Sequence, residues 1–336
     1  MSYKVFIAAT GAAKPIGLNV EGADAEGVTS AMDFLKSIKR GEAKSLSGNV
    51  AVIGGGSVAL DAARSAIRLG ADKVSVVCLE RLEAGLKDSM LALSEEIEDA
   101  VSEGVNIYPS KGVDSFVVKN NRVSSIKCVE CFSVRDEDGR FNPQYGDCVL
   151  PLEIDAGTVI LAIGQVADAT IVPEGFPVNE RGYIEADKET NEVAPGMFAA
   201  GDAVSGPSTV VEALAAGKRA AVTADLYLRG KEISADLFVE PAVFSVESSE
   251  NITRSERVNR SRMSGEERKN SFMDTVLPFK PEAVRRESER CLTCGSRPVI
   301  TYVADCQQCN LCSVYCPVDA VTVDPEKCFP PMLGWG

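Results

Sequence analysis

The stretch from Gly48 to Glu80, GNVAVIGGGSVALDAARSAIRLGADKVSVVCLE, constrains the fold more than any other part of the chain. A buried strand leads into a glycine turn, a helix and a second buried strand, which together form one βαβ unit. Gly54, Gly56 and Ala59 have the G-x-G-x-x-A spacing. The first glycine permits a tight turn, the second lets the backbone approach a diphosphate, and the small third residue lets helix and strand pack closely. The pattern predicts a dinucleotide site; the alternative is a glycine turn that serves packing alone.

The same pattern predicts which residues hold the nucleotide. Amide groups at the start of the helix face the diphosphate, so we expect Gly55, Ser57 and Val58 to line the site with the turn glycines. Glu80 ends the second strand about 20 residues further on, where a carboxylate accepts hydrogen bonds from both ribose hydroxyls of NADH and repels a 2′-phosphate. Arg81, beside it, is instead suited to attract that phosphate. On balance the sequence favours NADH over NADPH.

Hydrophobic periodicity and turn residues outline the other elements. Short β-type runs, with DEDGR as a turn, extend from Val105 to Leu152. Buried strands are expected in YKVFIAATGA and AGTVILAIGQ, a strand and glycine turn in GMFAAGDAV, and a helix in STVVEALAAGKRAAVTADLYLRG. A further helix is expected in TSAMDFLKSIKRG, where one face carries Ala31, Phe34, Leu35 and Ile38.

The segment SVESSENITRSERVNRSRMSGEERKN is polar, mixed in charge and poor in apolar periodicity. We expect a linker with one or two exposed helices from Lys231 to about Arg290, the region that contains this stretch. Its arginines are interpreted as a solvated surface.

Seven of the 11 cysteines lie between Cys291 and Cys328. Such crowding in a cytosolic chain points to metal ligation rather than to disulfides. A C-x2-C-x2-C-x3-C-P run typical of [4Fe–4S] ligation, in which the fourth cysteine serves a second cluster, is formed by Cys306, Cys309, Cys312 and Cys316 with the following proline. A zinc site is the alternative, but it would need only four ligands and no proline ending. The run predicts electron transfer.

The number of cysteines leaves the ligand sets open, because two Cys₄ clusters need one more thiolate than the seven present. One assignment gives the first cluster Cys306, Cys309, Cys312 and Cys328, and the second cluster Cys316, Cys291, Cys294 and a non-cysteine ligand. Another has a single cluster, with RCLTCG structural. Truncation of the C-terminus is a third explanation, since KCFPPMLGWG replaces a second cysteine run.

Composition excludes several other chemistries. The absence of histidine excludes Ser-His-Asp triads, Cys-His dyads and histidine-held metals. A net charge of −14 makes nucleic acid and anionic membranes poor partners. No apolar run approaches the roughly 20 residues of a membrane helix and no signal peptide is recognisable, so we expect a cytoplasmic chain without membrane insertion. The remaining cysteines are expected to be small buried apolar residues: Cys78, Cys128, Cys131 and Cys148.

Five segments resemble, in the same order, the small subunit of glutamate synthase and its relatives, which are flavoprotein reductases of the pyridine nucleotide–disulfide oxidoreductase type. They are FIAATGAAKP, VAVIGGGSVALDAARSAIRLGA, DEDGR, GTVILAIGQ and GMFAAGDAVSGPSTVVEALAAGKRAA. The resemblance covers roughly residues 4–230. It implies an α/β fold in which a Rossmann-like NAD(P)-binding domain is inserted in a partial FAD-binding domain. Several such relatives also carry a C-terminal ferredoxin-like module.

The resemblance also implies flavin contacts. The AAGD turn, which touches the ribityl and phosphate region of FAD, maps to Gly201 and Asp202, and the helix start near the isoalloxazine maps to Thr209 and Val210. For Asp202 a turn or helix-capping role is the alternative. The strand-to-turn crossings that line the flavin domain are matched by Thr10 and Gly11 in ATG and by Gly164 and Gln165 in AIGQ.

Relatives begin with a further glycine-rich βαβ unit that holds the ADP half of FAD, and this unit is expected to be missing here. Three explanations remain: another subunit completes the FAD domain, the sequence is a fragment, or FAD does not bind. The predicted regions are a partial FAD domain over residues 1–45 and 151–232, an NAD(P)-binding domain over 46–150, a polar linker over 233–290 and a ferredoxin-like iron–sulfur domain over 291–336.

These observations predict a subunit that moves electrons between NAD(P)H, a flavin and [4Fe–4S] clusters, in either direction. Other redox subunits, ferredoxin or another electron acceptor would be its partners. The hypothesis from a different class is a non-catalytic iron–sulfur relay or assembly subunit without FAD. The terminal acceptor is not encoded in any recognisable motif.

Overall fold

The computed structural model describes residues 3–43, 45–83, 85–146, 152–172, 174–232 and 256–289. The chain forms two compact units. The first comprises Met1–Val243 and Arg262–Thr275, and the second comprises Phe244–Ser261 and Val276–Gly336. Within the second unit the described part includes helix α7 (Pro281–Glu289). The predicted iron–sulfur region, with Cys291 through Cys328, lies outside the described residues, as does Cys148.

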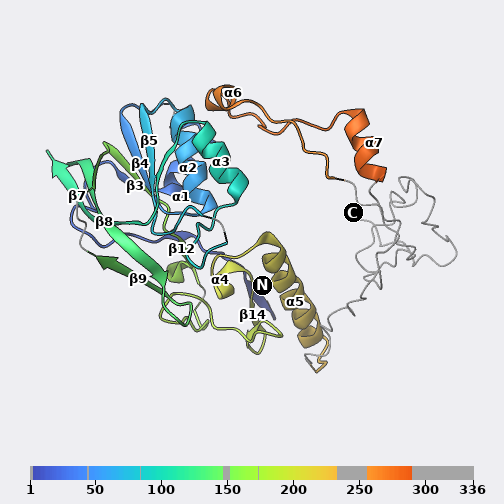
Figure 1. Ribbon diagram of the computed structural model, residues 1–336. Coiled ribbons are helices and arrows are strands. Elements are labelled where there is room, and N and C mark those ends of the chain that lie inside the picture. The colour runs from blue at the N-terminus through green and yellow to red at the C-terminus, as the bar shows by residue number, and fades with distance from the viewer. Residues whose placement is uncertain are drawn as a thin grey trace. The chain divides into compact units, whose positions relative to one another are not determined.

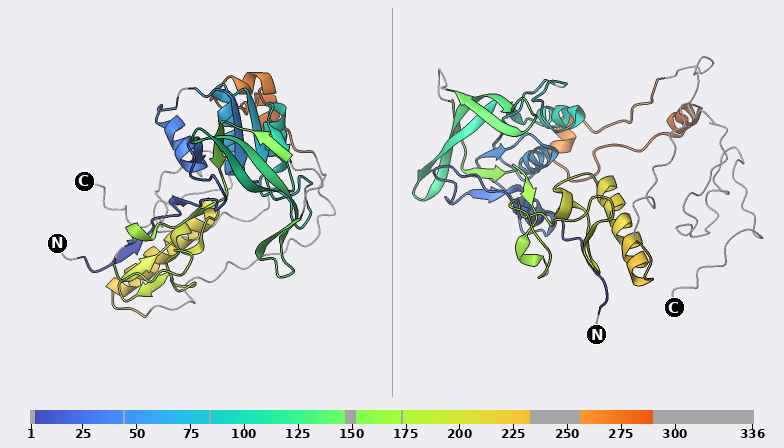
Figure 2. Two further views of the ribbon diagram at one scale, coloured as in Figure 1. Left: turned by 90° about the vertical axis from the view of Figure 1, so that its left-hand side faces the viewer. Right: turned by 90° about the horizontal axis from the view of Figure 1, so that it is seen from below.

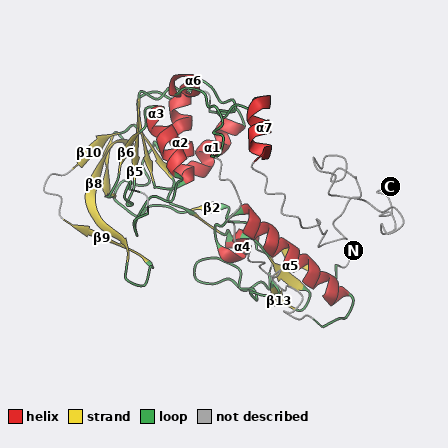
Figure 3. Ribbon diagram, turned by 45° about the vertical axis from the view of Figure 1, so that its right-hand side comes forward, coloured by secondary structure: helices red, strands yellow, loops and turns green. Residues whose placement is uncertain are grey.

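A five-stranded parallel sheet forms the centre of the first unit (Figure 1). Its order is β3-β11-β4-β5-β6, with bounds β3 Val28–Ser30, β11 Thr158–Leu161, β4 Asn49–Ile53, β5 Lys73–Val77 and β6 Asn106–Tyr108. One face is covered by α1 (Ala31–Lys39), α2 (Ser57–Arg68) and α3 (Ser94–Ser102), which gather on the same side in Figure 3. The predicted βαβ unit is therefore confirmed as β4-α2-β5.

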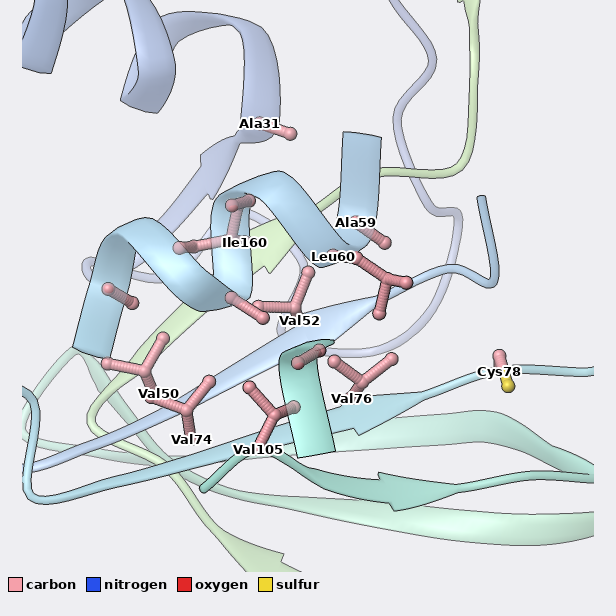
Figure 4. Close-up of a cluster of buried hydrophobic side chains, with 14 of the residues drawn as sticks. Ala31, Val50, Val52, Ala59, Leu60, Val74, Val76, Cys78, Val105 and Ile160 are labelled. Atoms are coloured by element: carbon pink, nitrogen blue, oxygen red, sulfur yellow. The ribbon is translucent and has the colours of Figure 1, made fainter. Parts of the chain in front are cut away.

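The core between α2 and the sheet explains why this segment folds as expected. Val50 and Val52 on β4 and Val76 on β5 belong to one buried cluster with Leu60 and the small Ala59 on α2, and Val52 and Val76 lie nearest to Leu60 (Figure 4). Alanines elsewhere on the buried face of α2 allow the close approach of helix to sheet. The opposite face of the sheet is buried as well, as a parallel sheet requires.

An antiparallel sheet covers that second face. Its strands are β7 (Lys111–Lys119), β8 (Arg122–Arg135), β9 (Phe141–Gly146) and β10 (Leu152–Asp155), with β8 pairing to the other three. The β-type prediction is confirmed, although β7 and β8 form one long hairpin rather than short runs. Asn120 and Asn121, both at positive φ, make its two-residue turn. The DEDGR turn is also present between β8 and β9, closed by the amide of Asp136 donating to the carbonyl of Arg140 and by the amide of Arg140 donating to the Asp136 carboxylate.

A second, smaller sheet lies beside α5 (Val210–Leu228), which runs along it in both views of Figure 2. Its order is β1-β14-β13, with bounds β1 Phe6–Ala8, β14 Met197–Ala199 and β13 Glu192–Ala194. The short helix α4 (Asp202–Ser205) follows β14. A two-stranded ribbon of β2 (Lys14–Pro15) and β12 (Gln165–Val166) and a 3₁₀ turn, Ala169–Ile171, connect it to the larger sheet. After the cofactors that the sequence resemblance implies, we call these elements the flavin lobe, and the larger sheet with its helices and β7–β10 the nicotinamide lobe.

The prediction of a buried N-terminal strand is wrong for two of its residues. Phe6 and Ile7 of β1 are 51% and 48% exposed, and only Ala8 is buried. β1 is the edge strand of its sheet and pairs in parallel with β14 alone. Its apolar composition is typical of a strand with neighbours on both sides, which the described residues do not provide.

The interpretation of the linker arginines as a solvated surface is wrong for Arg268. Residues Arg262–Thr275 return to the first unit, where α6 (Gly265–Lys269) packs against the nicotinamide lobe (Figure 1). Arg268 is 5% exposed and donates to Asp99 at 2.6 Å. The partners are 169 residues apart, so no local pattern could have predicted their pairing. Two helices are present in the region where one or two exposed helices were expected: α6, which packs against the nicotinamide lobe through Arg268, and α7.

Candidate dinucleotide site

A cavity of about 680 Å³ runs across the carboxyl ends of β11, β4, β5 and β6. This is the edge at which open parallel sheets bind ligands. One end is lined by Ala162–Gln165 after β11, the middle by Ile53–Val58 after β4, and the other end by Cys78–Glu80 and Lys111–Val113. All five residues predicted for the turn line it: Gly54, Gly55, Gly56, Ser57 and Val58.

The turn glycines have different roles. Gly54 has a φ of +133°, and an added Cβ would overlap the carbonyl oxygen of Ala162 on the neighbouring strand. Its lack of a side chain therefore serves the close approach of two strands. Gly56 has an ordinary extended backbone, and no atom lies within 4 Å of where its Cβ would be. That open space beside the cavity is what the backbone of a diphosphate-binding turn requires.

The N-terminus of α2 has the features of an anion site. Gly56 is its N-cap and offers no side chain to the first turn, so the first amides lack the usual capping oxygen. The hydroxyl of Ser57 donates to Glu96 of α3 at 2.7 Å, which ties α2 to α3. Ala59 is fully buried, as its position in the motif requires. A 12-residue helix with these free amides is suited to hold a diphosphate.

Glu80 lies three residues beyond β5, and its side chain turns back toward the glycines. Its Oε2 is 2.5 Å from the position that a Cβ on Gly55 would take. Burial raises the pKa of this carboxyl above its ordinary value, opposed by its own backbone amide and by Arg135. Arg81, by contrast, is exposed, does not line the cavity and donates to the carbonyl of Phe132 at 3.4 Å. Glu80 is thus the charged side chain that reaches the predicted ribose position.

Gly164 and Gln165 line the other end of the same cavity. Gly164 has a φ of +114° and accepts a hydrogen bond from the amide of Ile16 at 3.1 Å. Pro15, Ile16 and Met32 make this end apolar. The cavity therefore offers a polar glycine turn in its middle and an apolar chamber next to the ribbon that leads to the flavin lobe.

Of the eight residues mapped to the flavin domain, Gly164 and Gln165 line this cavity, and the other six form a separate group that does not line it. They lie at the carboxyl ends of β1 and β14 and at the start of α5: Thr10, Gly11, Gly201, Asp202, Thr209 and Val210. The Thr10 hydroxyl is buried with no hydrogen-bond partner among the described residues, which fits a ligand group that would bond to it. Asp202 accepts from the Ser208 hydroxyl at 3.0 Å, and Thr209 caps α5. The group thus combines a turn, a cap and one unsatisfied hydroxyl.

Sequence reasoning missed two aromatic side chains of the cavity, Phe141 and Tyr145, as well as Lys111 and Leu91. The alternation in FNPQY places Phe141 and Tyr145 on one face of a strand. That spacing was a usable signal, but which cavity the face meets depends on how β9 pairs with β8.

The described cysteines are buried and form no disulfide with one another: Cys78, Cys128 and Cys131. Burial raises the pKa of Cys78 to about 12, so its thiol stays protonated and unreactive at neutral pH. The prediction of small buried apolar residues is confirmed for these three. Within the described ranges no cluster of three or more histidine, cysteine or acidic residues has the arrangement of a metal site. The same ranges contain no helix long and apolar enough to cross a membrane.

A parallel sheet with a glycine turn, an N-terminal helix amide site and a cavity that ends beside a second lobe defines a two-lobed fold of the dinucleotide-binding class. The family model of pyridine nucleotide-disulphide oxidoreductases matches residues 1–217. The chain belongs to this family. FprA, an oxidoreductase of Mycobacterium tuberculosis, has the same fold, with a TM-score of 0.53 at 18% identity over 68% of this chain and 64% of FprA.

Two curated relatives extend the comparison. The NADP(+)-dependent formate dehydrogenase subunit beta of Moorella thermoacetica is 34% identical over 87% of this chain and 42% of its own length. The glutamate synthase [NADPH] small chain of Azospirillum brasilense is 29% identical over 67% of this chain and 49% of its own length. The predicted resemblance to glutamate synthase small subunits is confirmed. The chain spans about half the length of these relatives or less.

Proposed function

We propose that the chain is the nicotinamide-dinucleotide-binding part of an electron-transfer oxidoreductase subunit, which exchanges electrons between NAD(P)H, FAD and [4Fe–4S] clusters within a larger complex. The observation that carries the proposal is the cavity in which the open side of Gly56, the N-terminus of α2 and the Glu80 carboxylate meet. Family membership and the names of the relatives agree with pyridine nucleotide chemistry.

The bound dinucleotide would cross the sheet edge in one direction. Amides at Gly56 and the first turn of α2 hold its diphosphate, and Glu80 accepts from the adenosine ribose. The nicotinamide would then lie in the apolar chamber at Gly164 and Ile16. That apolar chamber would exclude water from the reacting carbon of the nicotinamide. Hydride transfer needs no protein acid or base, so the chamber needs none.

NADH is the preferred nucleotide in this proposal. A 2′-phosphate would enter a buried position beside the Glu80 carboxylate, at a cost in repulsion and desolvation. Arg81 donates to a backbone carbonyl of β8 and does not line the cavity, so its guanidinium is not placed to bind a 2′-phosphate there. The relatives are named for NADP(+) and NADPH, so selectivity is a point on which this chain would differ from them.

FAD would bind at the flavin lobe, where Thr10, Gly11, Gly201 and Asp202 follow two parallel strands. When bound, FAD supplies the change between two-electron hydride transfer and one-electron transfer. The lobe presents apolar side chains to solvent, with Val210 at 77% exposed and Val211, Leu214, Phe6 and Ile7 also exposed. Such a surface is expected where another polypeptide segment packs. We propose that this segment carries the ADP-binding half of the FAD domain.

The proposal of iron–sulfur clusters rests on the sequence alone, because the candidate ligands lie outside the described residues. The C-x2-C-x2-C-x3-C-P run at Cys306–Cys316 is the reason to propose at least one [4Fe–4S] cluster. Other redox subunits of the complex, or a ferredoxin, would exchange electrons with it. The iron and acid-labile sulfide content of anaerobically purified protein tests this part alone.

Calorimetric titration of the full chain with NADH and NADPH tests the nucleotide site. We expect NADH to bind more tightly, Gly56→Ala to lose at least tenfold in affinity, and Glu80→Gln to narrow the difference between the two nucleotides. Gly217→Ala, at an open position on α5, is the matched control. No binding of either nucleotide by the folded wild-type chain would refute the proposal.

The flavin part has its own test. We expect the chain mixed with a polypeptide carrying a glycine-rich βαβ unit from the same operon to retain FAD through gel filtration and to bleach when NADH is added anaerobically. An iron–sulfur spectrum without flavin under these conditions would favour the relay or assembly subunit instead.

A further inference from the structure

The dinucleotide cavity continues beyond Glu80, in the direction away from the nicotinamide chamber. The strand order places β6 next to β5, and the chain that follows β6 lines this end with Lys111, Gly112 and Val113. Phe141 and Tyr145 of β9 face the same space. Since Glu80 marks the adenosine ribose in the proposed function, the base attached to that ribose lies among these residues.

Tyr145 is held in place by a glycine contact. On β9 it pairs directly with Cys131 of β8, and its ring reaches across to Gly112 of β7. A Cβ on Gly112 would overlap the ring, so the ring lies against the bare backbone there. Phe132 covers Gly146 in the same way at the end of the strand. Aromatic rings over glycines are a common way to fix register in antiparallel sheets.

This packing uses only one side of the Tyr145 ring. The residue is 52% exposed, although it lines a cavity, and Phe141 is 65% exposed on the same face of β9. Two half-exposed aromatic rings at one end of a cavity provide an apolar surface for a flat group. Burial raises the pKa of Tyr145, so its phenol is neutral at physiological pH.

Charge at this end also favours an uncharged base. The Lys111 ammonium is paired with the Glu130 carboxylate, and both are partly buried. The Glu130 carboxylate thereby neutralises the charge of Lys111, so this ammonium is not available to bind an anion in the cavity. The end of the cavity combines aromatic faces with a neutralised cation, which suits an adenine ring and not a phosphate.

We propose that the adenine of the dinucleotide stacks on the free face of Tyr145, with Phe141 closing the edge of this subsite. The inference rests on the proposed function, because it uses the direction in which the dinucleotide crosses the sheet. It assigns to the β9 strand a role in nucleotide binding in addition to its structural one. Stacking of a base on an aromatic side chain contributes on the order of 1–3 kcal/mol.

The test compares three ligands with the full chain: NADH, ADP-ribose, which lacks nicotinamide, and reduced nicotinamide mononucleotide, which lacks adenosine. Tyr145→Ala should lower the affinity for NADH and for ADP-ribose by about tenfold each. Its affinity for the mononucleotide should not change. Tyr145→Phe keeps the ring and should bind all three ligands as the wild type does. Phe132→Ala is the matched control, since Phe132 covers Gly146 and is not a lining residue of the cavity.

Two results would overturn the inference. The first is a folded Tyr145→Ala variant that binds NADH with wild-type affinity. The second is an equal loss for all three ligands, which indicates damage to the sheet rather than loss of a stacking partner. If the wild type binds neither NADH nor ADP-ribose, the proposed function itself fails, and the two failures are thereby distinguished.

Discussion

The two lobes of the first unit use the same kind of element with opposite results. In the nicotinamide lobe the parallel strand β4 has neighbours on both sides and cores on both faces, and Val50 to Ile53 are all buried. In the flavin lobe β1 is also apolar and also pairs in parallel, but it has one neighbour and leaves Phe6 and Ile7 half exposed. An apolar parallel strand is fully buried only when it has strands on both sides and a packed layer on each face of its sheet.

This difference between the strands extends to the glycine turns that follow them, and it shows which turn is surrounded by other described residues. The turn at Gly54–Gly56 lies against Ala162 beyond β11 and against Cys78 and Glu80 beyond β5, and it lines a cavity. The turn at Gly201 meets α5 and little else, and the nearby Thr10 hydroxyl has no partner in the described part of the chain. In the proposed function, the described residues of the nicotinamide lobe therefore form the whole dinucleotide site, whereas those of the flavin lobe supply part of an FAD site.

The largest expected effect concerns a buried cluster of charged side chains where α2, α3 and α6 meet. The fully buried carboxylate of Glu103 accepts from Arg64 at 2.6 Å and pairs with Arg68 at 2.8 Å and Arg268 at 3.3 Å. Glu103→Gln leaves these guanidinium groups without their central countercharge. We expect the free energy of unfolding to fall by about 3–5 kcal/mol in chemical denaturation.

Glu95→Gln is the control for that variant, because Glu95 is mostly exposed and pairs only with Arg262 among the described residues. Its effect should stay below about 1 kcal/mol. Equal stability of Glu103→Gln and the wild type would mean that the return of residues 262–275 to the nicotinamide lobe does not depend on these charges.

A second prediction separates folding from binding at the turn. Gly54→Ala forces a Cβ into Ala162 at a φ of +133°, so it should destabilise the nicotinamide lobe by about 3 kcal/mol. Gly56→Ala has open space and should leave the melting temperature within a few degrees of the wild type. A large loss of stability in Gly56→Ala would show that this glycine serves packing rather than ligand approach.

The third prediction tests the contrast of the two strands directly. Val52→Ala removes two carbon atoms from a closed core and should cost about 2 kcal/mol. Ile7→Ala removes more carbon from an exposed position and should change the stability of the chain by less than about 0.5 kcal/mol. Ile7→Ala should instead weaken FAD retention with the completing polypeptide, measured by flavin absorbance after gel filtration. Comparable destabilisation by the two substitutions would remove the distinction between the lobes.

The smallest expected effect is the pH dependence of Glu80. Burial raises its pKa in the folded chain, so the folded state keeps this proton to a higher pH than the unfolded state does. The stability that Glu80 contributes is present at low pH and is lost as the pH rises through its folded pKa. Relative to Glu80→Gln, the wild type should therefore lose stability across that interval in denaturation curves. A constant difference between the two proteins from about pH 4 to about pH 8, a range that begins just below the ordinary pKa of a glutamate and extends well above it, would contradict the assignment.

Several elements could be predicted because their causes are local. The glycine spacing, the small residues of α2 and the continuous apolar strands on either side all lie within residues 48–80, and the structure has β4-α2-β5 there. The helix predicted from Ala31, Phe34, Leu35 and Ile38 is α1, with Ala31 and Phe34 buried. Glu80 was predicted for the cavity on spacing alone and lines it.

Other features depend on residues that are far apart in the chain. The burial of Arg268 requires α3, and the position of Tyr145 over Gly112 requires the pairing of β9 with β8. Arg81 was a reasonable phosphate ligand from its place beside Glu80, yet its side chain reaches the carbonyl of Phe132, 51 residues away. Periodicity carries no information about such distances, since it reports only which side of an element is apolar.

For this protein, the order of amino acids alone determined that a dinucleotide-type βαβ unit would form, because a strand, a glycine turn and a helix of small residues meet their packing needs within one short segment. Only the tertiary structure decided that β4 of the nicotinamide lobe is buried on both faces and that β1 of the flavin lobe is half exposed. An apolar strand has the same sequence whether or not a neighbour covers it, and the burial of its side chains is set by contacts with segments elsewhere.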